Sequence, residues 1–407
     1  MMQTKMRPIR NTIPFEEALD AILDTAQPVT RTVRVELDQA NGRVLAADIV
    51  ATRDVPPFDR AAMDGYAVVA EDTFGASRHE PRTLRCIEVV HSGSVPAKRL
   101  ECGDCTEIAT GAPIPEGASA VVMVEETNKS ADGAIQIFTP VYPQQHVGRR
   151  GADITANQAL LTAGEVLTPS RVGSVAALGI AEIEVFARPR VAILSTGNEI
   201  IEPGRPLGPG QIYDINRYTL NAVIGEHGGV AVSHPTVADT LMSLDAAIDT
   251  CLENDVLVFS GGSSVGERDL TLDALKRKGE VLFHGIALKP GKPTVFGRIG
   301  RTPVLGMPGY PTSCLSNAYM LLVPLLHRLA HLPPHQIRTL SVPTAQRFIS
   351  TTGRHQFYTV RVMDGVAIPA FKASGDITSM SQADGYIEIP AQTDIVEKGE
   401  MVEVKLF

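Results

Sequence analysis

The chain has 407 residues, more than one hydrophobic core usually organises, so we expect two to four domains. Its 37 Lys and Arg residues against 46 Asp and Glu residues leave a net charge of −9, and no basic run could follow a nucleic acid backbone. Nucleic acid is therefore excluded as the main partner. An anionic ligand must instead be held locally, by glycine-rich loops, helix N-termini, lysines or a bridging cation.

The sequence carries no signal for export or membrane insertion. Residues 1–20 contain basic side chains without an apolar stretch behind them. The most apolar segment, 315–332, is interrupted by polar residues and Pro324, so it falls short of the ~20 apolar residues that span a bilayer. We therefore expect a soluble cytoplasmic protein with no membrane partner.

The cysteines are few, odd in number and widely spaced, which fits reduced thiols in the cytoplasm. One Cys-x-x-Cys pair, Cys102 and Cys105, has neither a second pair nor suitably spaced histidines nearby. A structural zinc site usually needs such partners. The pattern therefore favours an ordinary structural role for these thiols over metal binding or redox chemistry.

The N-terminal half begins with a predicted helix and continues mostly as β-structure. Apolar residues at helical spacing predict a helix over 14–25, with Thr12 as a cap and Pro14 in its first turn. Alternating segments over 30–50 and 84–141 predict short strands. Between them, residues 53–69 are rich in turn formers yet contain Met, Phe and Tyr, which indicates an ordered functional loop.

Residues 188–332 alternate short apolar runs with segments of helical period, the pattern of βαβ units and a mainly parallel sheet. The predicted strands are 191–195, 230–233, 256–260, 281–285, 294–297 and 303–306. The predicted helices are 216–227, 241–252, 271–278 and 312–329. After Pro333 and Pro334, short strands punctuated by Gly and Pro predict a small β domain over 336–407.

Ligands of an open α/β sheet bind outside the carboxyl ends of its strands. Three predicted strand ends carry glycines and hydroxyls, in the segments STGNE (195–199), SGGSSVGERD (260–269) and GMPGYPTS (306–313). A single turn of this kind is most simply structural, but three on one edge indicate an anion site, since glycines let backbone N–H groups approach closely. The candidate binding residues there are Gly261, Gly262, Ser263, Ser264, Gly309 and Ser313.

Two further sets of charged residues fit such a site. Lys289 and Lys292 are each followed directly by proline, which restricts the backbone and can hold both amines toward an anion. Five acids lie in turn-rich or strand-end contexts, namely Asp64, Asp153, Glu199, Asp239 and Asp269. Taken singly each acid is most simply a cap or turn former. Jointly they could hold a divalent cation against an anionic ligand, because hard cations prefer oxygen ligands.

Nine short motifs follow one another along the chain in an order that resembles a known family. The chain contains FDRAAMDGYAV (58–68), TGAP (110–113), RGADI (150–154), STGNE, QIYDINRY (211–218), GGSSVGERD, LKPGKP (288–293), SGD (374–376) and ADG (383–385). In this order, over essentially the whole length, the motifs resemble those of the molybdopterin molybdenumtransferases, the family that includes the gephyrin E domain.

The resemblance implies an α/β multidomain protein with a central, mainly parallel domain of the molybdopterin-binding type over 188–334. A mostly β domain (51–148) is then inserted in an N-terminal linking and dimerisation domain (1–50 plus 149–187), and 335–407 form a small β-barrel. The implied enzyme is a Mg²⁺-dependent transferase that binds adenylylated molybdopterin and molybdate, releases AMP and leaves molybdenum on the dithiolene sulfurs.

The resemblance also implies roles for particular residues. The functional acids are Glu199, Asp269, Asp64, Asp153 and Asp239, and the metal ligands among them are Glu199, Asp239 and Asp269. Thr110 is a polar partner, and the two lysines of LKPGKP lie near the anions. The implied assembly is a homodimer in which Asp64 acts in the site of the other subunit. Transient partners are a molybdopterin adenylyltransferase and the enzymes that accept the cofactor.

The sequence departs from the family pattern at three positions. Asn198 stands where an acid is common, and its amide can ligate a cation but cannot be a general base. Tyr310 replaces the usual Asn of a Gly-Asn-Pro turn, and Ala152 replaces an acid in the RGAD segment. We hypothesise that Tyr310 reshapes the oxyanion pocket toward tungstate.

Three alternatives remain open from the sequence. A tungsten insertase keeps the fold and the pterin substrate, and side-by-side metal incorporation separates it from a molybdenum enzyme. A pterin-binding scaffold has no chemical reason to keep all the acids, lysines and glycine-rich loops together. A generic nucleotide or sugar-phosphate enzyme lacks support, because neither G-x-x-x-x-G-K-[ST] nor a helix-opening G-x-G-x-x-G is present.

Overall fold

The structure is a computed structural model that describes residues 9, 11–238, 240–261 and 270–407. By its internal contacts the chain forms two compact units. The larger unit comprises Met1–Val33, Gly42–Val44 and Val185–Phe407, and the smaller unit comprises Arg34–Asn41 and Leu45–Glu184. Among the described residues, no helix is long and apolar enough to cross a membrane.

The larger unit is built on a six-stranded sheet with the order β16-β13-β17-β21-β20-β18. Its strands are β13 (Arg190–Ser195), β16 (Val230–Ser233), β17 (Val256–Ser260), β18 (Glu280–His284), β20 (Val295–Ile299) and β21 (Thr302–Met307). The first four in sheet order pair in parallel, whereas β20 and β18 are antiparallel. All six predicted strands, and the mainly parallel sheet, are confirmed.

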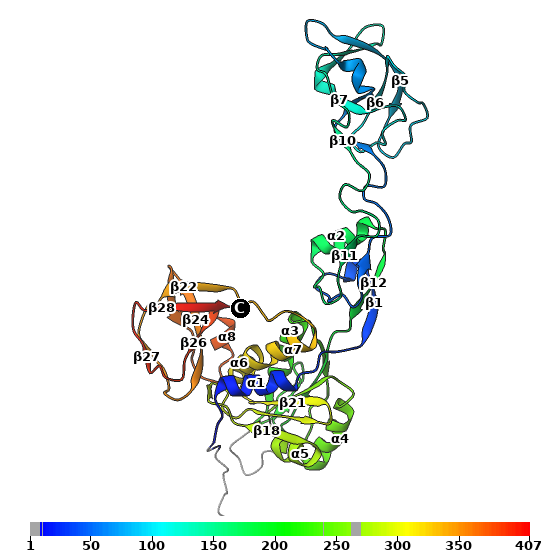
Figure 1. Ribbon diagram of the computed structural model, residues 1–407. Helices are drawn as coiled ribbons and strands as arrows, with labels where there is room; N and C mark the ends of the chain where they lie inside the picture. Colours follow the sequence, from blue (N-terminus) through cyan, green and yellow to red (C-terminus); the bar gives the residue numbers. More distant parts are fainter. Residues whose placement is uncertain (1–8, 10, 239, 262–269) are drawn as a thin grey trace, which may run out of the picture. The chain divides into compact units, whose positions relative to one another are not determined.

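Helices cover both faces of this sheet (Figure 1). One face is packed by α1 (Phe15–Thr25), α3 (Asn216–Glu226), α6 (Pro311–Asn317) and α7 (Val323–Leu329). The other face is packed by α4 (Leu241–Cys251) and α5 (Leu270–Lys278). Apolar residues of β13 and β17 alternate between these two cores, which is why both strands read as continuous apolar runs.

Two helix predictions need correction in detail. Helix α1 begins at Phe15 with Pro14 as its N-cap and no side-chain cap, so Thr12 lies too far upstream to cap it. The single helix predicted over 312–329 is α6 and α7 joined by a π-helical turn, Ala318–Leu322. That turn ends two residues before Pro324, whose nitrogen cannot donate to the helical ladder, so the regular bonding changes near it.

The C-terminal part of the larger unit is a small sheet with the order β19-β24-β26-β28-β22, with β25 added beside β24. Its strands are β19 (Leu288–Lys289), β22 (Thr339–Pro343), β24 (His355–Met363), β25 (Val366–Pro369), β26 (Gly385–Ile389) and β28 (Met401–Leu406), beside the pair β23 (Phe348–Ile349) and β27 (Ile395–Val396) and the short helix α8 (Thr378–Ser381). A bridge between Thr344 and Ala367 brings the β22 end back to β25. This closure confirms the predicted barrel.

The smaller unit contains a second six-stranded sheet, with the order β7-β4-β6-β5-β9-β8. The strands are β4 (Gly65–Val68), β5 (Arg82–Val90), β6 (Asp104–Ile108), β7 (Ala120–Met123), β8 (Thr127–Lys129) and β9 (Ile135–Ile137). The predicted β-structure of 84–141 is confirmed. The loop predicted over 53–69 is wrong at its end, because Gly65–Val68 is a fully buried inner strand.

Shorter elements complete the chain. The smaller unit also has the pairs β2 (Ile49–Val50) with β11 (Ala159–Leu161) and β3 (Arg60–Ala61) with β10 (Val147–Gly148). Its helix α2 (Pro169–Ala177) is capped by the Thr168 side chain. The pair β1 (Thr32–Glu36) and β12 (Glu182–Phe186) carries the chain between the units, and β14 (Ile200–Ile201) pairs with β15 (Ile212–Tyr213) in the larger one.

Candidate functional site

The three glycine-rich segments predicted from the sequence follow three neighbouring strands of the central sheet. Ser195 at the end of β13 lies beside Ser260 at the end of β17, which lies beside Met307 at the end of β21. The ladder continues one residue further, since Thr196 N–H donates to the Ser260 carbonyl and Gly261 N–H donates to the Met307 carbonyl. We call these three strand ends, the loops that follow them and the start of α3, which contacts Gly309 through Asn216, the strand-end edge.

Glycine is required where these segments converge. Gly261 has φ +97°, and a Cβ there would lie 2.7 Å from the Thr196 carbonyl oxygen. A Cβ on Gly309 would lie 3.5 Å from the Gly261 Cα, so the turn after β21 touches the turn after β17. The loops therefore close on one another without side chains between them, which exposes backbone to a ligand.

Four buried oxygen atoms at the strand-end edge have no hydrogen-bond partner among the described residues. They are Ser195 Oγ, Thr196 Oγ1, Asp214 Oδ2 and Asn216 Oδ1. Their residues are only 2%, 5%, 4% and 6% exposed. Buried polar atoms are usually paired, and an unpaired one costs roughly 1–3 kcal/mol. Four together mark a polar region below the edge whose hydrogen bonds are incomplete among the described residues.

Asp214 and Asn216 enter the edge at the start of α3. Asp214 Oδ1 accepts from the Arg217 backbone N–H at 3.0 Å, which leaves its second oxygen for other partners. Asn216 Nδ2 donates to the Gly309 carbonyl at 2.8 Å and so links α3 to the turn after β21. Neither residue was among the predicted site residues. The sequence feature that could have identified them is the QIYDINRY segment, which has an acid and an amide next to the start of a helix.

Glu199 stands at the same edge, but in an exposed position. Its carboxylate folds back over Gly197, where a Cβ would lie 2.7 Å from Glu199 Oε1. After Glu199, strand β14 pairs with β15, and the Glu199 carbonyl accepts a hydrogen bond from the Ile212 N–H. Five predicted site residues lie outside the described residues: Gly262, Ser263, Ser264, Asp239 and Asp269.

The two predicted lysines are held by specific contacts within the larger unit. Lys289 Nζ donates to Thr351 Oγ1 at 2.6 Å, and Lys292 Nζ donates to the Ile9 carbonyl at 2.7 Å. Each ammonium has three donors, so each can still bind an anion. Gly291 between them packs against Asn317, because a Cβ there would lie 2.1 Å from Asn317 Oδ1. The LKPGKP segment is therefore docked on the helix after β21.

The turn after β21 also receives the C-terminal part of the larger unit. Thr312 at the start of α6 donates through its N–H to the Ser374 carbonyl and through its hydroxyl to the Asp376 carbonyl. The SGD segment is thus brought to the strand-end edge. Ser313 is buried on α6, whereas Tyr310, the N-cap of α6, has a side chain that is 65% exposed.

The smaller unit holds Asp64 and Thr110, which the structure brings together. Asp64 Oδ1 accepts the Thr110 backbone N–H at 2.7 Å. This bond, with a second one from the Thr110 side chain, holds the pKa of the Asp64 carboxyl below its usual value. Asp64 is thus an ionised, exposed carboxylate at the start of β4.

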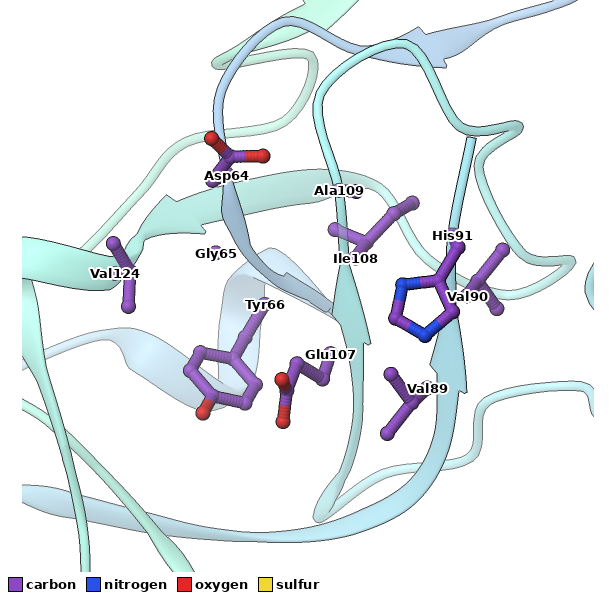
Figure 2. Close-up of a pocket in the computed structure, with 10 residues that line it drawn as sticks. All are labelled: Asp64, Gly65, Tyr66, Val89, Val90, His91, Glu107, Ile108, Ala109 and Val124. Carbon is purple, nitrogen blue, oxygen red and sulfur yellow. The ribbon is translucent and has the colours of Figure 1, made fainter. Parts of the chain in front are cut away.

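Asp64 lies at the rim of an open pocket of about 170 Å³ (Figure 2). The pocket is lined by residues of β4, β5 and β6, with Tyr66, Glu107 and His91 among its polar side chains. Asp153 does not line it. That residue is exposed, and its backbone N–H donates to the Val55 carbonyl at 3.0 Å. The structure therefore joins Asp64 with Thr110 and leaves Asp153 apart from this pocket.

The cysteines are all thiols in the structure. Cys102 Sγ donates to Asp72, and Cys105 is buried in β6. Cys314 lies buried below the strand-end edge, where burial raises its pKa to about 12. A neutral thiol is a poor nucleophile, so the described chemistry of the edge rests on oxygen and nitrogen groups.

Comparison with known proteins agrees with this architecture. The model of the MoeA N-terminal region (domain I and II) matches residues 13–179, that of a probable molybdopterin binding domain matches 192–328, and that of the MoeA C-terminal region (domain IV) matches 341–407. The strand-end edge falls in the second match and Asp64 in the first.

Individual relatives span nearly the whole chain. A molybdopterin molybdenumtransferase 2 of Mycobacterium tuberculosis is 36% identical over 92% of this chain and 95% of its own length. A molybdopterin molybdenumtransferase of Haemophilus influenzae is 31% identical over 97% and 98%. A crystal structure of a molybdopterin biosynthesis MoeA protein from Pyrococcus horikoshii superposes with a TM-score of 0.83 at 41% identity, covering 97% and 99%. The chain therefore belongs to the MoeA family, the molybdopterin molybdenumtransferases.

Proposed function

We propose that this chain acts in molybdenum cofactor biosynthesis and transfers molybdenum from molybdate to adenylylated molybdopterin, with release of AMP. The observation that carries this proposal is the group of four buried, unpaired oxygen atoms at the strand-end edge, in the part of the chain that matches the molybdopterin binding domain. Such atoms are costly in a protein whose only task is to fold. They are useful where a polar ligand completes their bonds.

The polar groups of the strand-end edge complement those of the proposed substrate. The pterin and ribose carry hydroxyls and N–H groups that can donate to Ser195, Thr196 and Asn216. The phosphates and molybdate are anions, for which Gly261, Gly262, Ser263, Ser264, Gly309 and Ser313 offer backbone and hydroxyl donors. Lys289 and Lys292 supply the positive charge that this acidic chain otherwise lacks.

The oxygen donors of the edge fit a Mg²⁺ ion. Glu199 offers an exposed carboxylate and Asp214 a buried oxygen without a partner among the described residues, and Mg²⁺ prefers such ligands. Glu199, Asp239 and Asp269 would hold the ion, with Asp214 as an additional ligand. When bound, it would screen the phosphate charges and polarise the phosphoanhydride. The residues themselves bind and orient the adenylate so that AMP can leave.

In this proposal, the smaller unit of one subunit contributes residues to the active site of the other subunit. We infer a homodimer in which Asp64, supported by Thr110, acts in the site formed by the strand-end edge of the partner, and in which Asp153 also takes part. Asp64 fits this role because its ionised carboxylate is exposed beside an open pocket. The predicted linking, inserted, central and C-terminal domains, 1–50 plus 149–187, 51–148, 188–334 and 335–407, remain part of this proposal.

The cellular setting is also proposed. The protein acts in the cytoplasm, where thiols stay reduced. It receives the adenylate from a molybdopterin adenylyltransferase and passes the cofactor to enzymes that use it.

The test uses purified protein with adenylylated molybdopterin, Mg²⁺ and either molybdate or tungstate, and measures AMP release and the metal bound to pterin. We expect AMP release that requires molybdate and is lost in Glu199→Ala. Tight pterin binding without turnover would contradict the enzyme and favour a scaffold. Equal incorporation of tungsten would contradict the preference for molybdenum.

A further inference from the structure

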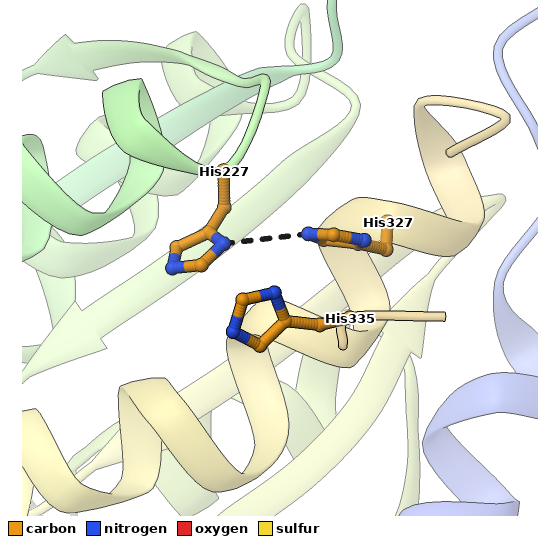
Figure 3. Close-up of side chains that lie close together, drawn as sticks. All are labelled: His227, His327 and His335. Carbon is orange, nitrogen blue, oxygen red and sulfur yellow. Dashed lines mark hydrogen bonds between the residues drawn. The ribbon is translucent and has the colours of Figure 1, made fainter. Parts of the chain in front are cut away.

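Three histidines gather at the end of α3 that lies away from the strand-end edge. His227 is the C-cap of α3, His327 lies in α7, and His335 follows Pro333 and Pro334 (Figure 3). Asn216 at the start of α3 belongs to the strand-end edge, and 11 residues of helix span about 16 Å. The histidine cluster is therefore separate from the proposed pterin site.

The ring nitrogens of the cluster have the spacing of metal ligands. One nitrogen from each ring lies within 4.8 Å of the other two. The distance from His227 Nδ1 to His327 Nε2 is 3.3 Å. Ligands at ~2.0–2.1 Å from a tetrahedral zinc ion lie about 3.3–3.4 Å apart, so this pair already matches one edge of the tetrahedron. His335, the exposed member, offers the third nitrogen.

The orientation of His327 is fixed by a second contact. Its Nδ1 lies 2.7 Å from the Pro333 carbonyl oxygen. Because a carbonyl only accepts, His327 Nδ1 must carry the proton, and its Nε2 accepts the hydrogen bond from His227 Nδ1–H. A metal ion between the two nitrogens would replace this hydrogen bond, with the His227 proton moving to the other ring nitrogen. Metal-binding histidines are typically held in this way, with the second ring nitrogen donating to a carbonyl or carboxylate.

We propose that His227, His327 and His335 form a binding site for one Zn²⁺ ion. Imidazole nitrogens are common ligands of zinc. Water completes the coordination at the solvent side, where His335 and Glu226 are exposed. His331 is not part of this group, and its ring stacks on Phe186.

The bound ion would connect elements far apart in the chain. His227 and His327 are 100 positions apart, and His335 lies on the segment that leads from α7 into β22. The site thus ties the end of α3 to the start of the C-terminal barrel. A ligand that binds only the folded state raises stability by mass action, so Zn²⁺ should stabilise the larger unit.

The test is a titration of the full-length, chelator-treated protein with Zn²⁺ against a competing chelator, combined with thermal unfolding. We expect one tight equivalent per chain and a rise in the unfolding temperature. His327→Gln and His335→Gln should each weaken this equivalent at least tenfold and abolish the rise. His335 is exposed, so its variant is expected to fold even if changes at the buried His227 do not.

Matched controls separate this site from other ligands. His79→Gln changes an exposed histidine of the smaller unit, Cys102→Ser removes the exposed thiol, and Glu199→Ala removes a proposed Mg²⁺ ligand. All three should keep the Zn²⁺ equivalent, whatever their effect on AMP release. Loss of the equivalent in a control, its retention in His327→Gln and His335→Gln, or the absence of any tight equivalent would overturn the proposal.

Discussion

The strand-end edge and the Asp64 pocket each hold an aspartate of a candidate site, but Asp214 and Asp64 lie in opposite environments. Asp214 is buried, and one of its oxygens lacks a partner among the described residues. Asp64 is exposed and accepts a bond from the Thr110 backbone. The proposed function assigns the first region to a bound ligand that would complete these hydrogen bonds. The second region keeps an ionised carboxylate in contact with solvent.

The largest expected effect is that of Asp214→Asn at the strand-end edge. The amide keeps the shape of the side chain but removes a negative oxygen, so AMP release should fall about 100-fold, the scale of a lost electrostatic contact at a reacting centre. Stability should be unchanged or higher, since a buried unpaired charge is removed. The control is Asp249→Asn, a surface residue that pairs with Lys278. A full rate in Asp214→Asn would refute the role of this residue.

The next prediction concerns Gly261, where the loop after β17 comes close to the loop after β13. In Gly261→Ala the new methyl meets the Thr196 carbonyl at 2.7 Å and the backbone has φ +97°. We expect a loss of about 2–3 kcal/mol in the free energy of unfolding, measured in urea. Gly300→Ala is the matched control, since it also has positive φ, +59°, but nothing within 4 Å of its Cβ. Equal losses in both variants would show that the contact with Thr196 is unimportant.

Mixing two inactive variants tests whether Asp64 acts in the partner's site. Asp64→Asn and Glu199→Ala are each expected to be inactive alone. After random exchange of subunits, half of the dimers are mixed, and each has one intact site if the two residues come from different chains. Roughly a quarter of wild-type AMP release should then return. No recovery, with subunit exchange verified by mass, would place both residues in one chain.

The smallest effect is expected from Tyr310→Asn. Tyr310 is exposed at the N-cap of α6, so its removal should leave stability nearly unchanged. If it shapes the oxyanion pocket, the ratio of molybdenum to tungsten bound to pterin should shift a few-fold, since a pocket discriminates similar groups by only about 1–3 kcal/mol. The same ratio in wild type and variant would count against the hypothesis.

Much of the fold could be predicted because its signals are local. The strands of the central sheet are short apolar runs whose every side chain is buried, as in VAIL (191–194) and VLVFS (256–260). The incorrect secondary-structure predictions also have local causes. The inner strand Gly65–Val68 was read as part of a loop, because it is short and directly follows a segment rich in turn formers. The helix before Pro324 was not expected to change to π-helical bonding.

The site could be predicted only in part. Glycines after strands indicated where the loops meet, and Asp64 with Thr110 followed from the family motifs. Asp214 and Asn216 were missed, because nothing in QIYDINRY shows that α3 buries them or that Asn216 reaches Gly309. Asp153, predicted with the other acids, lies apart from the Asp64 pocket.

The sequence alone determined the fold class, the family and the residue types available for chemistry, because periodicity, turn residues and motifs are properties of neighbours in the chain. Tertiary structure decided which groups meet. His227 and His327, 100 positions apart, face each other only because α3 and α7 pack on the same side of the sheet. Burial and unpaired atoms likewise depend on contacts between distant segments, so no reading of local pattern could supply them.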